Sequence, residues 1–73
     1  MTQKEMIMNY MERFGSISPM EAFTDLGITK LATRVSELRR DGNIIDGTLE
    51  KSHNRFGTRV EYMRYSIGKE AEK

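Results

Sequence analysis

The sequence has no cysteine, a single proline, a single histidine and no long apolar run. Without cysteine, neither a disulfide framework nor a cysteine-based zinc site can form. Apolar runs of only a few residues predict no transmembrane segment, and no apolar stretch of a signal peptide follows Lys4. These absences are consistent with a cytoplasmic protein that has no membrane partner.

Residues that carry enzymatic chemistry are also scarce. His53 has no second histidine or cysteine with which to share a metal ion, and the carboxylates are dispersed along the chain. The glycine-rich patterns of nucleotide-binding loops are absent. We therefore predict no enzymatic activity, no catalytic residue, no metal, no cofactor and no small-molecule substrate.

Length and charge set further bounds. A chain of 73 residues forms one domain. The 12 basic and 11 acidic residues leave a net charge of +1, which argues against a purely electrostatic nucleic-acid binder. A protein that reads a DNA groove is still compatible with this balance, because there the placement of charge matters more than the total.

A first helix is predicted from Thr2 to Gly15. Thr2 and Glu5 match a capping box, and Gly15 suits the residue that ends a helix. Between them, one apolar face is formed by Ile7, Tyr10, Met11 and Phe14. Residues 16–17 are too short for an independent element, although they could pair with later strands.

A second and a third helix follow, separated by a minimal turn. Ser18, Pro19 and Glu21 form a strong helix start, and Gly27 is predicted to end the second helix in the left-handed conformation. Its apolar side consists of Ala22, Phe23 and Leu26. Thr29 is predicted to cap the third helix, whose buried side, expected to pack on Ile7, Met11 and Phe14, consists of Leu31, Val35 and Leu38.

The pattern changes to a period of two after Asp41 and Gly42 end the third helix. Residues 44–50 and 58–67 are predicted strands flanking a hairpin loop at residues 52–57. Gly47 indicates a bulge or a close backbone approach. The core face of the second strand is predicted to hold Met63, Tyr65 and Ile67, and residues 68–73 form a charged tail that is expected to fray.

Three helices followed by a hairpin are the α+β architecture called a winged helix-turn-helix, here predicted over residues 1–67. In that architecture the third helix enters the DNA major groove and the hairpin, or wing, contacts phosphates or the minor groove. Residues predicted to face the groove are Thr29, Lys30, Thr33, Ser36 and Arg40. Residues predicted to hold the backbone or enter the minor groove are Arg34, Lys51, His53, Asn54, Arg55 and Arg59.

The run ISPMEAFTDLGITKLATRVSELRRDGNII, with NRFG and a later V-x-Y-x-R-Y-x-I, resembles small winged helix-turn-helix proteins of bacteriophages and prophages. The resemblance covers residues 2 to 67 and implies a recognition helix at residues 29–40, a wing at residues 51–59 and a bacterial host cell. Gly27 stands five residues after Ala22, one more than in repressor-type helix-turn-helix proteins, which suits the winged turn.

The predicted function is sequence-selective binding of double-stranded DNA, as a phage-type transcriptional regulator or a recombination accessory protein. A homodimer is left open, because one module of this size buries little surface on DNA. The alternative is a phage-encoded module that binds and inhibits a host protein, which the low net charge and Glu37 near the reading face favour. A third interpretation, a dimerising structural domain, depends on Met8, Phe56 and Tyr62.

Overall fold

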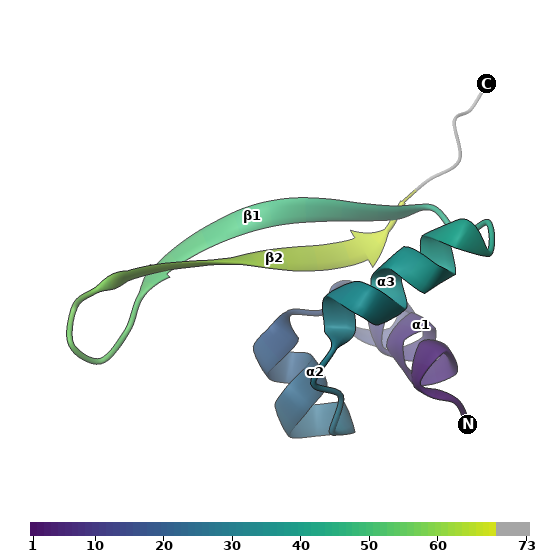
Figure 1. Ribbon diagram of the computed structural model, residues 1–73, viewed down its shortest axis with the longest axis horizontal. Coiled ribbons are helices and arrows are strands. Elements are labelled where there is room, and N and C mark those ends of the chain that lie inside the picture. Colours follow the sequence, from purple (N-terminus) through teal and green to yellow (C-terminus); the bar gives the residue numbers. More distant parts are fainter. Residues whose placement is uncertain (69–73) are drawn as a thin grey trace.

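A computed structural model describes residues 1–68, which form three helices followed by an antiparallel two-stranded sheet (Figure 1). The elements are α1 (Gln3–Phe14), α2 (Pro19–Leu26), α3 (Leu31–Arg40), β1 (Ile45–His53) and β2 (Arg59–Ile67). The predicted α+β winged helix-turn-helix architecture is thereby confirmed. The charged tail was predicted at residues 68–73. Its first residue is bound, because the Gly68 amide donates to the Ile44 carbonyl at 2.8 Å, and residues 69–73 lie outside the described part of the chain.

Side-chain caps fix where the first two helices begin. Thr2 Oγ1 accepts from the Glu5 amide at 3.1 Å, and Ser18 Oγ accepts from the Glu21 amide at 3.2 Å. Each glutamate reaches back to the capping residue's amide, so both predicted capping boxes are confirmed. Gly27 ends α2 with a φ of 72°, a left-handed conformation that a side chain with a Cβ adopts only with strain.

The start of α3 differs from the prediction. Its N-cap is Lys30 and no side chain caps it, so the prediction that Thr29 caps this helix is wrong. The reason lies in the turn before it. The Ile28 amide closes α2 by donating to the Ala22 carbonyl at 3.0 Å, and the Ile28 side chain is fully buried. Thr29 therefore stands one residue too early, and the first carbonyl to accept within α3 is that of Lys30, from Arg34.

All five elements contribute to one hydrophobic core. Leu31, Val35 and Leu38 are buried, as predicted, and the remaining buried apolar residues are Ile7, Met11, Ile17, Ala22, Ile28, Ile45 and Tyr65. Ile7, Ile17, Ile28 and Val35 are the largest side chains that are fully buried. The core thus lies between the three helices and the base of the hairpin.

Three apolar residues predicted to be buried are instead exposed. Phe14 is 66% exposed, Phe23 57% and Ile67 37%. Phe14 and Ile67 are the last residues of α1 and β2, where the neighbouring elements no longer cover the apolar face. The Phe14 ring lies 4.6 Å from the ring of Tyr10 instead of packing on α3. α2 has only eight residues, and Ala22 is the one it buries fully, so Phe23 stays outside.

The hairpin is longer and its loop shorter than predicted. Nine consecutive pairs run from Ile45↔Ile67 to His53↔Arg59, so Ser52 and His53 belong to β1 and not to the loop. The unbroken register excludes a bulge at Gly47. The alternative, close approach, is confirmed, because a Cβ there would lie 2.7 Å from Met63 Cε.

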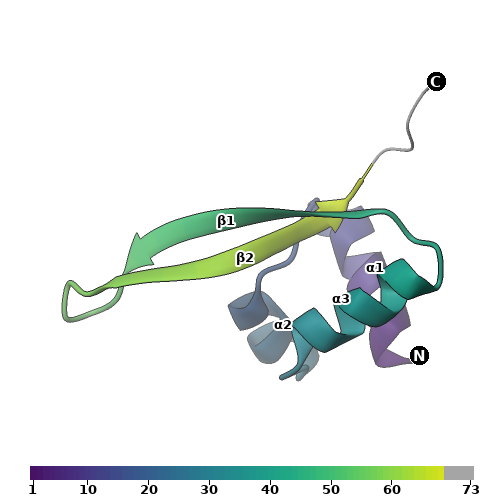
Figure 2. The same ribbon diagram turned by 45° about the horizontal axis from the view of Figure 1, so that its top comes forward.

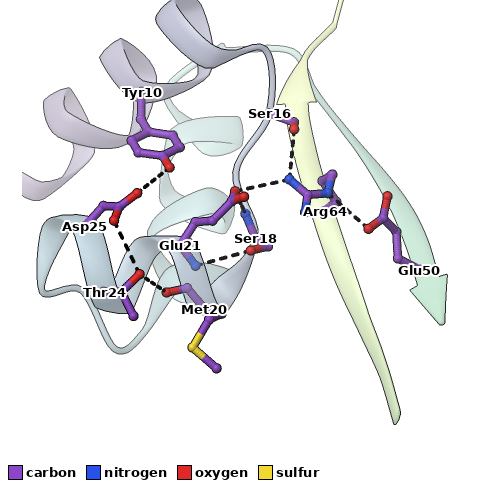
Figure 3. A network of polar contacts seen from close by, with 9 residues as sticks. All are labelled: Tyr10, Ser16, Ser18, Met20, Glu21, Thr24, Asp25, Glu50 and Arg64. Atoms are coloured by element: carbon purple, nitrogen blue, oxygen red, sulfur yellow. Dashed lines mark hydrogen bonds and ion pairs between the residues drawn. The ribbon is translucent and has the colours of Figure 1, made fainter. Parts of the chain in front are cut away.

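Two of the connections between the hairpin and the rest of the fold are made by β2. Ile17 forms the predicted short strand pair with β2 through two bonds to Tyr65, of 2.8 and 2.9 Å. On the opposite strand face, Arg64 donates to Glu50, to Ser16 and to Glu21 at 3.0–3.1 Å (Figure 3). The pKa of Glu50 lies below its ordinary value, chiefly because the Arg64 guanidinium donates to its carboxylate and secondly because the Tyr62 hydroxyl does.

Candidate nucleic-acid interface

The outer side of α3 is the first part of the candidate interface. Leu31, Val35 and Leu38 face the core, which turns the other side of the helix to solvent. Predicted groove-facing residues that are exposed there, or just before the helix, are Thr29, Lys30, Thr33, Ser36 and Arg40. Hydroxyl, ammonium and guanidinium groups on an uncovered helix are able to donate to base edges and phosphates.

Two other arginines of α3 are already engaged. Arg34 Nη1 lies 3.1 Å from Glu37 Oε1, and both side chains are about one-third exposed. This pairing occupies part of the guanidinium predicted to hold phosphate and neutralises the carboxylate nearest the reading face. Arg39 donates to the Ile45 carbonyl at 2.7 and 3.1 Å and lies over the Tyr65 ring, so it anchors β1 to α3.

The second part is the outer hairpin, defined here as residues 51–61, all of which are exposed. Side chains of directly opposed residues share a face in an antiparallel pair. The pairs Lys51↔Glu61 and His53↔Arg59 therefore place three predicted contact residues, Lys51, His53 and Arg59, on one face. Ser52 and Val60 occupy the other face. The outer hairpin thus has a basic face and a nearly neutral one.

The tip of the hairpin is a tight turn. The Asn54 amide donates to the Thr58 carbonyl at 2.9 Å, and Asn54 Oδ1 accepts from the Phe56 and Thr58 amides at 2.9 and 3.0 Å. The side-chain oxygen of Asn54, a predicted contact residue, is thus used to build the turn. Arg55, the next predicted contact, lies in the turn and is exposed.

The start of α3 and the hairpin tip point in the same direction. In both views α3 begins beside α2, and the tip lies beyond this same end of the helix (Figures 1 and 2). Lys30 and Thr33 belong to this end. Arg40 is the last residue of α3, about 15 Å further along the helix axis, beside the base of the hairpin. The start of α3 and the outer hairpin thus lie toward the same side of the molecule but apart from one another, and Arg40 lies at the other end of α3.

Ion pairing leaves these two parts positive despite the low net charge. The carboxylates of Glu21, Glu37, Asp41 and Glu50 are each within 4.0 Å of a cation. Within residues 1–68, no carboxylate lies within 4.0 Å of the cations of Lys30, Arg40, Lys51, Arg55 and Arg59. The cations without a carboxylate partner among the described residues are thus concentrated on α3, its N-cap and the outer hairpin, which the net charge of the sequence does not reveal.

The described residues contain no cluster of three or more histidine, cysteine or carboxylate side chains suited to a metal ion. Among the same residues, none of the helices has the length and apolar character needed to span a bilayer.

A family model described as a winged helix-turn-helix domain matches residues 2–70. No curated protein and no solved structure matches the chain at the significance we required.

Proposed function

The chain belongs to the winged helix-turn-helix domain family, and on that premise we propose that it binds double-stranded DNA with sequence selectivity. The observation that carries the proposal is the arrangement of cations. Lys30 at the start of α3 and Lys51, Arg55 and Arg59 on the outer hairpin have no carboxylate within 4.0 Å among the described residues, and the hairpin tip lies beyond the end of the helix at which α3 begins. DNA phosphates are the complementary surface for such a set.

The two parts take different tasks in this proposal. Thr33 and Ser36 face the bases of the major groove, with Thr29 and Lys30 at its edge and Arg40 on the far side. The outer hairpin holds the adjacent backbone through Lys51, Arg55 and Arg59, with His53 and Asn54 beside them. Arg34 contributes less, because Glu37 shares its guanidinium.

The biological role proposed is that of a phage-type transcriptional regulator or a recombination accessory protein. The sequence resemblance to phage and prophage proteins supports it. One module of this size covers little DNA, so we propose that it acts as a homodimer or in tandem on its target.

A salt titration tests DNA binding. Because counterions are released, the logarithm of affinity falls linearly with the logarithm of salt concentration, and Arg55→Ala is expected to flatten this slope by about 1. Thr33→Ala is expected to reduce discrimination among sequences by about 1–3 kcal/mol while leaving the slope unchanged. Arg13→Ala is the matched control, because it removes one exposed cation from α1, outside the interface.

The alternative, a module that binds and inhibits a host protein, is favoured by one observation. Two phenylalanine side chains outside α3, Phe14 on α1 and Phe23 on α2, are exposed. If the wild-type protein binds no duplex at about 50 mM salt, where electrostatic binding is strong, DNA binding is wrong and these helices are the place to look for a protein partner.

A further inference from the structure

Phe56 is the most exposed large apolar side chain of the described residues, at 90%. It lies in the turn at the tip of the hairpin, and every residue around it, from 51 to 61, is exposed as well. Figure 1 shows the tip standing well clear of the helices, and the exposure of the ring shows that the described residues leave it almost uncovered. A phenylalanine ring gains much from burial, and here that gain is left for a partner.

The backbone on either side of the ring is held in a defined turn. The Phe56 amide donates to Asn54 Oδ1 at 2.9 Å, and the Gly57 amide donates to the Asn54 carbonyl at 2.9 Å. Gly57 adopts a φ of 81°, the left-handed conformation that lets the chain reverse directly after Phe56. Because the backbone of the turn is already ordered without a partner, its ordering adds no cost when the ring is buried in one.

The charges beside the ring indicate the partner. Arg55 precedes Phe56, and the first pair below the turn is His53 with Arg59, none of them within 4.0 Å of a carboxylate of the described residues. An apolar protein surface offers no partner to basic groups, which here precede the ring in the sequence and form the first strand pair below its turn. A nucleic-acid duplex offers phosphates for the cations and an apolar base stack between them.

We propose that Phe56 inserts into the base stack of the bound duplex and partially separates one base step, while Arg55 and Arg59 hold the flanking phosphates. This inference rests on the proposed DNA binding and adds a mode of contact to it. Insertion of an apolar side chain from the minor groove bends DNA toward the major groove, so the complex is expected to contain bent DNA.

The experiment uses a pool of short random duplexes that carry a fluorescent adenine analogue, whose emission rises when it is unstacked. The wild-type protein is expected to raise the emission and to bend end-labelled duplexes, as measured by energy transfer. Phe56→Ala is expected to bind about 10- to 100-fold more weakly, with no rise in emission and less bending. Its salt slope is expected to stay unchanged, because no charge is removed.

Two variants act as controls. Phe14→Ala removes another exposed phenylalanine, on α1, and is expected to leave affinity and emission unchanged. Phe56→Trp keeps a ring able to stack and is expected to restore both. The thermal midpoint of Phe56→Ala is expected to equal that of the wild type, because the ring contacts almost nothing in the free protein.

The outcomes separate the two proposals. If Arg55→Ala weakens binding while Phe56→Ala changes neither affinity nor emission, insertion is wrong and DNA binding stands. If Phe56→Ala weakens binding but the wild type raises no emission and bends no DNA, the ring has another role and insertion is again wrong. If the wild type binds no duplex at all, both proposals fail.

Discussion

The helical body, made of α1 to α3 with Ile17, and the outer hairpin are held in opposite ways. The body buries all the large apolar residues that are fully inaccessible, Ile7, Ile17, Ile28 and Val35, whereas the outer hairpin buries none of its side chains. One part is stabilised by packing and the other by backbone hydrogen bonds and a tight turn. Stability and binding are therefore expected to respond to different substitutions.

The largest expected effect is in the body. Leu38 is 5% exposed and packs in the core, so Leu38→Ala is expected to lower the free energy of unfolding by about 2–5 kcal/mol. Arg59→Ala on the outer hairpin is expected to change it by less than about 0.5 kcal/mol while weakening DNA binding. Denaturant titration and a binding assay on both variants measure this. If Arg59→Ala is the less stable of the two, the division between body and outer hairpin is wrong.

A smaller effect is expected at Arg64, where the two regions meet. The folded pKa of Glu50 lies below its unfolded value, chiefly because of the Arg64 bond, so this stabilisation is present above the unfolded pKa, about 4.3. It is lost as the pH falls through the folded pKa. We expect the denaturant midpoint of Glu50→Gln to fall less steeply with acid than that of the wild type, and Arg64→Gln to behave similarly. Parallel midpoint curves for all three proteins would contradict this.

The smallest effect on stability is expected from one hydrogen bond within the helical body. The Tyr10 hydroxyl donates to Asp25 Oδ2 at 2.6 Å, which raises the pKa of Tyr10 to about 12 (Figure 3). The neutral phenol is favoured in the folded state, so its contribution is present below the unfolded pKa of about 10 and is lost as the pH rises to about 12. Asp25→Asn is expected to lower the pKa of Tyr10, as seen in the ultraviolet absorbance of phenolate. Tyr10→Phe is the control, because it removes the phenolate transition that belongs to Tyr10. If the transition with the highest pKa is still present in this variant, it belongs to another tyrosine and the prediction is wrong.

The elements of the fold could be predicted because their signals are local. Capping residues such as Ser18 and Glu21 are three positions apart, and the buried side of α3 follows the helical period. The predicted burial of Phe14 and Phe23 was wrong, because periodicity identifies an apolar face but not how far a neighbouring element covers it. The Thr29 cap was wrong because burial of Ile28 decides where α3 begins.

For the candidate site, the sequence predicted the residues but not their grouping. The pairing of His53 with Arg59 depends on the hairpin register, and the ion pair of Arg34 with Glu37 depends on rotamers. Arg64 has partners up to 48 residues away, which no local pattern in the sequence indicates. The contact residues themselves stay a prediction.

The bridge between Ile17 and Tyr65 has a consequence for how the chain reaches its final state. Helices and hairpin form from near neighbours, but this bridge, like the Ser16–Arg64 bond, joins residues 48 positions apart. Closing so long a loop costs about 3 kcal/mol of chain entropy before the contacts repay it, and contacts of this range slow folding. The hairpin is fixed relative to the helices only when this loop closes, so the proposed DNA binding is expected to require complete folding.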